Sequence, residues 1–118
     1  MAIEKVSEDR LLVKMPSTTL KITEELGTVS QMVSEQCTYD LVIDFSRVEL
    51  LNSYNISTLL ALQDLLHAAG HQLILCKVNL VTKCIFTVAG LNNVFTFADN
   101  AETAFATLRD PKLPARMC

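Results

Sequence analysis

The chain has 118 residues, of which 50% are hydrophobic and 19% are charged, and its formal net charge is −3. This length suits one domain with one hydrophobic core. The lysines and arginines are scattered singly, which argues against nucleic acid as a partner, because phosphate binding needs a clustered basic face. No stretch approaches the ~20 apolar residues of a membrane span, and the first residues lack the apolar core of a signal peptide. We therefore expect a cytoplasmic protein that does not bind membranes.

A hairpin and a helix are expected before residue 40. The apolar segment 10–15 precedes Pro16, as is typical of a strand, and residues 3–6 are expected to pair with it through a turn at 7–9. Residues 23–25 are predicted to begin a helix, because acidic residues favour a first helical turn. Apolar residues recur at helical spacing along this segment: Ile22, Leu26, Val29 and Val33.

The run 41–45 is apolar on both faces, as in a central strand that is covered on two sides. After a loop at 46–51, Asn52 and Ser53 are suitable N-cap residues for a helix that ends near Gly70. A broad buried stripe is predicted on this helix: Ile56, Leu59, Leu60, Leu62, Leu65 and Leu66. The opposite face carries small and polar residues: Thr58, Ala61, Asp64 and Ala68.

The remaining chain is predicted to form a strand, a helix, a second strand and a second helix. The strands occupy residues 72–76 and 94–97. The first helix is capped by Asn79 and runs to Val88, and the second is capped by Asn100 and covers residues 101–108. The long connections favour parallel strands. We therefore predict an α/β sandwich, in which an N-terminal hairpin is followed by β-α-β-α-β-α around a mixed sheet, with about four helices. One domain is expected at 1–110, followed by a loose tail at 111–118.

Residue types that support catalysis are sparse. The three glycines are isolated, so no phosphate-binding loop is present. His67 and His71 are expected near a helix C-terminus, where they suit the helix dipole. Asp44 ends a central strand and is expected to cap the adjacent loop. The chain is therefore predicted not to be an enzyme and to use no metal or cofactor.

The four cysteines do not form a CxxC pair or a zinc-binding pattern. They are Cys37, Cys76, Cys84 and Cys118. Cys76 ends an apolar run and Cys84 lies in a helical pattern, so we interpret them as buried reduced thiols. Cys118 is expected to be exposed.

The segment 52–58 places six hydrogen-bonding side chains at a predicted helix N-terminus. Free backbone N–H groups and the positive end of the helix dipole favour an anion there, including a covalently attached phosphate. Ser53, Ser57 and Thr58 are the hydroxyl residues able to carry one. The alternative is an ordinary helix-capping cluster.

This segment and two others together resemble the STAS domain, the fold of bacterial anti-sigma factor antagonists. Residues 41–51 resemble the central strand of the family and its continuation. Residues 52–56 stand where the family has Asp-Ser-Ser-Gly-Leu, and residues 73–78 with 88–95 resemble a later strand and the turn that follows the next helix. The likeness covers about residues 8 to 108.

The resemblance implies a non-enzymatic module for partner switching in transcription regulation. In the family, a serine at the start of the second helix is phosphorylated by a kinase that is also an anti-sigma factor, and the unphosphorylated form binds that partner. This chain has Tyr54 at the acceptor position, and Asn52 and Asn55 replace the Asp and Gly of the motif. Ser53 is therefore the candidate phosphorylation site. Asn55 is able to adopt the left-handed conformation that glycine often supplies.

The expected partner is an anti-sigma factor or serine kinase-like protein, bound by a monomer or weak dimer. Two alternatives remain open: a sensor of a small molecule or nucleotide at the same helix N-terminus, and a structural subunit of a larger sensory or transport assembly. The residues expected to contact the partner lie in the capping segment and on the exposed side of the helix: Asn52, Ser53, Tyr54, Asn55, Ser57, Thr58, Ala61, Asp64 and Ala68.

Overall fold

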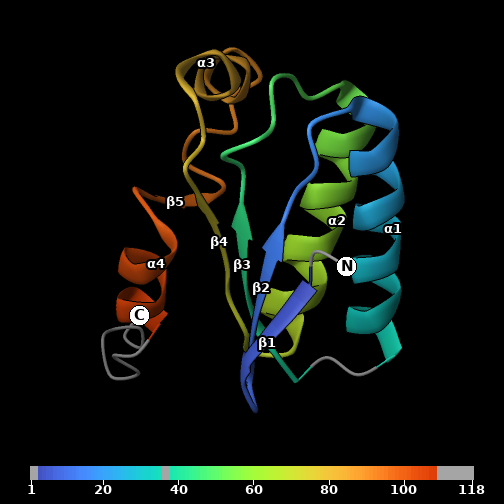
Figure 1. The fold of residues 1–118 in the computed structure, drawn as a ribbon, viewed down its shortest axis with the longest axis vertical. Helices are drawn as coiled ribbons and strands as arrows, with labels where there is room; N and C mark the ends of the chain where they lie inside the picture. Colours follow the sequence, from blue (N-terminus) through green and yellow to red (C-terminus); the bar gives the residue numbers. More distant parts are fainter. Residues whose placement is uncertain (1–2, 36–37, 109–118) are drawn as a thin grey trace.

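The structure is a computed structural model that describes residues 3–35 and 38–108, so the tail predicted at 111–118 lies outside the described residues (Figure 1). Strands and helices alternate after an initial hairpin. In chain order they are β1 (Ile3–Ser7), β2 (Arg10–Lys14), α1 (Thr19–Glu35), β3 (Asp40–Asp44), α2 (Ser53–Ala68), β4 (Leu73–Cys76), α3 (Leu80–Val88), β5 (Thr96–Ala98) and α4 (Ala101–Leu108).

The five strands form one sheet in the order β1-β2-β3-β4-β5. β1 and β2 pair antiparallel, whereas the three later pairings are all parallel. The register places Leu12 beside Val42, and Val42 beside Ile74. The predicted mixed sheet with an N-terminal hairpin and a following β-α-β-α-β-α order is therefore confirmed.

The two faces of the sheet are covered by different helices, because successive strand side chains point to opposite faces. On β3, Leu41 and Ile43 belong to the main core, which includes the buried faces of α1 and α2. Val42 belongs to a smaller cluster with Ala104 and Leu108 of α4. Figure 1 shows α1 and α2 side by side on one side of the sheet and α4 on the other. The prediction of a central strand covered on both faces is confirmed.

Helix α1 begins one turn earlier than predicted. It starts at Thr19, and the hydroxyl of Thr18 accepts a hydrogen bond from the backbone N–H of Lys21 at 3.4 Å. A hydroxyl cap therefore marks the start of the helix rather than the acidic residues, which lie in its second turn. The four predicted apolar positions of α1 are all buried, as expected. Strand β5 is also displaced: it begins at Thr96, not at residue 94.

Fewer apolar residues of α2 are buried than predicted. Leu59, Leu62 and Leu66 are buried, but Leu65 is 40% exposed, and Ile56 and Leu60 are half-buried. Polar residues complete the buried face instead: Asn55 and Gln63. The side-chain amide of Gln63 donates to the carbonyl of Val94 at 2.6 Å. This hydrogen bond offsets the free-energy cost of burying the polar side chain.

Helix α3 lies at the carboxyl end of the parallel strands, at the top of Figure 1. Phe86 attaches it to the core: its buried ring lies 5.3 Å from the ring of Phe95 and 5.7 Å from that of Phe97. Cys76 is buried as predicted, but Cys84 on α3 is exposed, because it lies on the side of the helix opposite Phe86. Among the described residues, no helix has the length and apolar character needed to cross a membrane.

Candidate functional site

The N-terminus of α2 is built by a single capping residue. Asn52 has an extended backbone, and its side-chain oxygen accepts the backbone N–H of Asn55 at 2.8 Å. The helix therefore begins at Ser53. The first N–H groups of a helix have no partner within it, and the helix dipole is positive at this end. The structure thus brings an exposed serine hydroxyl to the position where the helix favours an anion.

Most residues predicted to contact a partner lie on one exposed stripe of α2. Spacings of three and four residues place Ser53, Ser57, Ala61, Asp64 and Ala68 along the same side of the helix, and all five are exposed.

Tyr54 lies beside the start of this stripe, and its side chain is 64% exposed. Thr58 is half-buried, and its hydroxyl donates to the backbone carbonyl of Tyr54 at 3.1 Å. The Thr58 hydroxyl is therefore engaged within the helix.

Asn55 was predicted to contact a partner, but it lies inside the domain. Its side chain is fully buried, and its oxygen accepts a hydrogen bond from the hydroxyl of Thr23 on α1 at 2.9 Å. Its backbone is helical, since Lys77 is the one non-glycine residue with positive φ in the described part of the chain. Asn55 therefore does not use the left-handed conformation that is open to asparagine, and its side chain links α2 to α1.

An apolar groove separates the start of α2 from α3. It has a volume of about 510 Å³, and none of its eight lining residues is charged. Leu51, Ser53 and Ile56 form one wall, and five residues around α3 form the other: Val81, Cys84, Ile85, Val88 and Ala89. The candidate phosphorylation site Ser53 is therefore part of the groove itself.

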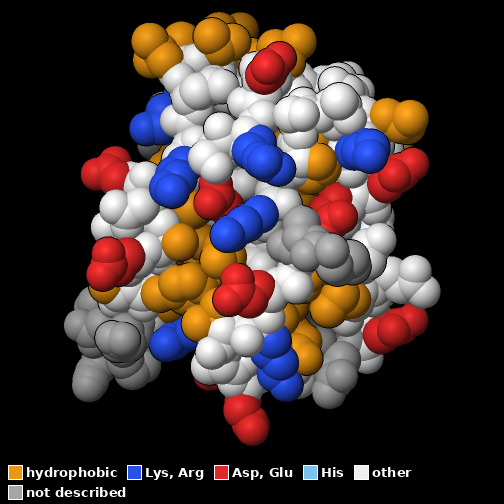
Figure 2. Space-filling model, in the orientation of Figure 1, with side chains coloured by type: hydrophobic (Ala, Val, Ile, Leu, Met, Phe, Trp, Pro, Cys, Tyr) orange, Lys and Arg blue, Asp and Glu red, His pale blue; other side chains and the backbone are white. Residues whose placement is uncertain are grey.

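The α3 side of this site is absent from the predicted residues. Leu80 is 76% exposed and Val88 is 88% exposed, and Figure 2 shows hydrophobic side chains gathered over α3 at the top of the molecule. The sequence contains a usable signal, because residues 80–88 are apolar around most of the helix circumference. A nine-residue helix at the end of a sheet buries only one face, so the other apolar face must be exposed.

The two walls of the groove are connected by Asn79. Its side-chain oxygen accepts the backbone N–H of Thr82 at 2.7 Å and so caps α3. Its side-chain amide donates to the carbonyl of Val48 at 2.9 Å, in the loop that leads to α2. One side chain therefore sets the position of α3 relative to this loop.

The other polar residues considered from the sequence lie away from the groove. The carboxylate of Asp44 accepts the backbone N–H of Ser46 at 2.8 Å, which confirms the predicted loop cap. His67 lies in the last turn of α2, as expected. His71 lies just beyond the helix end, where its backbone N–H donates to the carbonyl of Leu66 at 2.8 Å, and its Nδ1 is 3.2 Å from the carboxylate of Asp40. Within residues 3–35 and 38–108, no group of His, Cys, Asp and Glu side chains is arranged to hold a metal ion.

Comparison with known proteins gives a family and a fold. A family model described as the STAS domain matches residues 11–104. No curated protein matches the sequence significantly.

Among solved structures, a variant of RsbS from Moorella thermoacetica is 20% identical, covers 93% of this chain and 95% of its own, and superposes with a TM-score of 0.78. The anti-sigma factor antagonist SpoIIAA in its unphosphorylated form is 16% identical, with coverages of 91% and 94% and a TM-score of 0.76. SpoIIAA of Bacillus in the phosphorylated form is 17% identical, with coverages of 91% and 97% and a TM-score of 0.71. At these identities the likeness concerns the fold.

Proposed function

Because the chain belongs to the STAS family, we propose that it is a non-enzymatic protein-binding module of the anti-sigma factor antagonist type. Its proposed partner is an anti-sigma factor of the serine kinase kind. The partner contacts the exposed stripe of α2 and the apolar groove between α2 and α3. The observation that carries this proposal is the position of Ser53, a phosphorylatable hydroxyl on the wall of an uncharged groove.

The groove suits a protein partner because its exposed surface is apolar and continuous with the outer face of α3. Exposed apolar patches with polar surroundings are typical of protein interaction sites. Along α2, the small side chains of Ala61 and Ala68 permit close approach of a partner backbone. Tyr54 adds a large exposed ring beside the start of the stripe, and tyrosine is among the residues enriched in the energetic centres of interfaces.

Phosphorylation of Ser53 is the proposed control of this binding. A phosphate adds a charge of about −1.5 to −2 at neutral pH. At the first position of α2 the helix dipole favours that charge, so the domain stays folded. The same charge beside an uncharged groove must be desolvated when a partner docks, which opposes binding. SpoIIAA, which shares this fold, has been solved in both unphosphorylated and phosphorylated forms.

The test uses serine kinases with anti-sigma activity from the organism that carries this chain. Their affinity for the purified protein is measured by calorimetry for the unmodified chain and for Val88→Glu, Ala61→Glu and Ser53→Asp. We expect each variant to bind at least about tenfold more weakly, since each places an unpaired charge in the interface. Mass spectrometry after incubation with the kinase and ATP is expected to locate phosphate on Ser53.

Ala106→Glu is the matched control, because Ala106 is exposed on α4, away from the groove. It is expected to leave the affinity within about twofold, as a surface change outside the interface does. Circular dichroism and thermal unfolding establish that each variant is folded. The proposal is wrong if no such kinase binds, or if Val88→Glu and Ala61→Glu bind as tightly as Ala106→Glu.

A further inference from the structure

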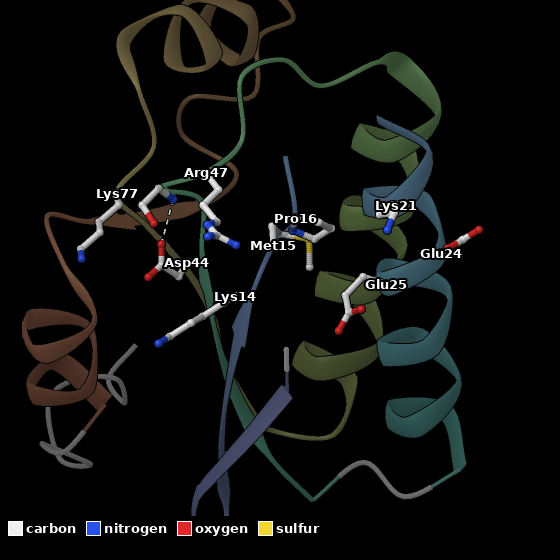
Figure 3. A pocket seen from close by; sticks show the side chains of 10 residues that line it. Lys14, Met15, Pro16, Lys21, Glu24, Glu25, Asp44, Arg47 and Lys77 are labelled. Atoms are coloured by element: carbon white, nitrogen blue, oxygen red, sulfur yellow. Dashed lines mark hydrogen bonds between the residues drawn. The ribbon is translucent and has the colours of Figure 1, made fainter. Parts of the chain in front are cut away.

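A second hollow lies at the carboxyl ends of the parallel strands β2, β3 and β4, and it is charged where the groove is apolar (Figure 3). Its volume is about 850 Å³, and seven of its ten lining residues are charged. It shares no lining residue with the apolar groove. In open α/β sheets the carboxyl edge of the strands is where ligands usually bind, and the volume is within the usual range for small-molecule pockets.

Three cations from successive strand ends surround one carboxylate in this hollow. Lys14 is the last residue of β2, Arg47 follows β3 and Lys77 follows β4, and Figure 3 shows their side chains around Asp44. Three cations and one carboxylate give this end a net charge of +2. Among the described residues, the only ion pair is the one between His71 and Asp40. None of the three cations is therefore neutralised by a contact with a carboxylate.

The backbone holds two of these groups in fixed positions. Asp44 accepts the N–H of Ser46, which orients the turn that carries Arg47. Lys77 has a φ of 56°, a left-handed conformation that costs a non-glycine residue about 1 to 2 kcal/mol. Its backbone N–H donates to the carbonyl of Ala98 at 3.3 Å, which keeps Lys77 at the strand end.

The other end of the hollow contains a carboxylate oxygen that lacks a partner. Oε2 of Glu25 is buried and has no hydrogen bond among residues 3–35 and 38–108. Figure 3 shows the Glu25 side chain pointing from α1 toward the strand ends, with Met15 and Pro16 between it and the cations. Buried acceptors are nearly always hydrogen-bonded in folded proteins. The Glu25 oxygen is therefore suited to accept a hydrogen bond from a ligand.

We propose that this hollow binds a small phosphomonoester whose other end carries an amino or hydroxyl group. A phosphomonoester is close to a dianion at neutral pH and so matches the net charge of +2 at the strand ends. Lys14, Arg47 and Lys77 donate charge-assisted hydrogen bonds to the phosphate oxygens. The amino or hydroxyl group at the other end donates to Oε2 of Glu25. The site is separate from the partner-binding surface, so the two proposals stand or fall independently.

The test measures binding of O-phosphoethanolamine to the full chain by calorimetry and by backbone NMR shifts. Inorganic phosphate and ethanolamine serve as the two halves of the probe. Glycerophosphoethanolamine, whose phosphodiester group carries a single negative charge, represents a lipid headgroup. We expect O-phosphoethanolamine to bind at least about tenfold more tightly than either half or the diester, with the largest shifts at Ser46, Arg47 and Lys77. Tighter binding of the diester would overturn the proposal in favour of a lipid headgroup.

Variants separate a built site from general attraction to positive charge. Lys77→Gln and Arg47→Gln are each expected to weaken binding of O-phosphoethanolamine about tenfold. Glu25→Gln is expected to weaken binding of O-phosphoethanolamine but to leave inorganic phosphate unaffected. Lys5→Gln removes the same charge from exposed β1 and is expected to change affinity less than twofold. The proposal is overturned if O-phosphoethanolamine does not bind at millimolar concentration, if the shifts centre on Ser53, or if Lys77→Gln and Lys5→Gln behave alike.

Discussion

The apolar groove and the charged hollow share a connection but present opposite chemistry. Residues 45–52, which join β3 to α2, contribute Ser46 and Arg47 to the charged hollow and Leu51 to the groove. The hollow is built mainly from the ends of strands and the turns that follow them. The groove is built from two helices, and its α3 wall exposes apolar side chains. The carboxyl end of the sheet therefore carries two neighbouring surfaces of opposite chemistry, and the elements that line each surface determine its character.

The two surfaces suit different kinds of ligand. Charged side chains at strand ends contact a small ligand with directed hydrogen bonds, which favours a compact anion. Apolar side chains on a helix favour a broad surface from which water is excluded, which suits another protein. A change that alters one surface and leaves the other intact is therefore the sharpest test of the comparison.

The largest expected effect comes from removing the residue that attaches α3 to the core. Phe86→Ala is expected to lower the free energy of unfolding by about 3 to 5 kcal/mol, because a large buried ring is replaced by a cavity. Denaturant unfolding measures this change. Val88→Ala on the exposed side of the same helix is the control, with an expected change within about 0.5 kcal/mol. Equal effects of the two substitutions would contradict the placement of α3.

The next largest effect is a loss of stability at alkaline pH that originates at Cys76. Burial, with a further contribution from Asp44, raises the pKa of the Cys76 thiol from 9.0 to about 11, and Lys77 partly opposes this. The unfolded chain therefore loses the proton first, and stability that is complete below pH 9 falls as the pH rises to 11. A shift of this size corresponds to at most about 2 to 3 kcal/mol.

Denaturant unfolding from pH 8 to 11 under reducing conditions measures the decline in stability. Cys76→Ala is expected to flatten this part of the profile, whatever its effect on stability at neutral pH. Cys84→Ser is the control, since it changes an exposed thiol and keeps the buried one. A profile that is equally steep in Cys76→Ala and in the unmodified chain would exclude this origin of the pH dependence.

A smaller effect is expected at the residue that connects the walls of the groove. Asn79→Ala removes the cap of α3 and the hydrogen bond to Val48, and we expect a loss of about 1 to 2 kcal/mol in unfolding free energy. Asn79→Ser keeps a capping oxygen but cannot reach both groups. If the connection to Val48 matters for the groove, Asn79→Ser weakens partner binding while it lowers the free energy of unfolding by about 1 kcal/mol or less, because the cap is kept and one hydrogen bond is lost. Unchanged partner binding would show that α3 keeps its position without this contact.

The smallest effect is a gain in stability at the charged hollow. Lys77→Gly is expected to raise the free energy of unfolding by about 0.5 kcal/mol, because relief of the left-handed backbone exceeds the added entropy of the unfolded chain. Lys77→Gln keeps the unfavourable backbone and is expected to show no gain. Both substitutions remove the same cation, so both are expected to weaken O-phosphoethanolamine binding. A loss of stability in Lys77→Gly would show that the lysine side chain stabilises the domain.

Much of the fold was predictable because its signals are local. The apolar runs of β2, β3 and β4 and the asparagine caps of α2, α3 and α4 each act within a few residues. The start of α1 was misplaced because acidic residues suit any early turn, whereas the Thr18 cap is a single weak signal. Leu65 was misplaced because helical spacing does not reveal that Gln63 takes a place on the buried face through its bond to Val94.

The candidate site was predicted in part. The exposed stripe of α2 follows from spacing along one helix, which a sequence displays directly. The contact between Asn55 and Thr23 joins residues 32 positions apart, and the groove joins Ser53 to Val88 across two elements. The cations of the charged hollow are likewise dispersed in the sequence. They become neighbours only because parallel strands end at the same edge of the sheet.

The strand order of the sheet has a consequence for how the domain is assembled. Each strand pairs with the one that precedes it in the chain, so no strand must be inserted between two that are already paired. The sheet is therefore able to grow at one edge as the chain emerges from the ribosome, from β1 toward β5. Helix α3, strand β5 and helix α4 join last, in that order. A nascent chain that has completed β4 contains most of the charged hollow, whereas the apolar groove forms only after α3 is added.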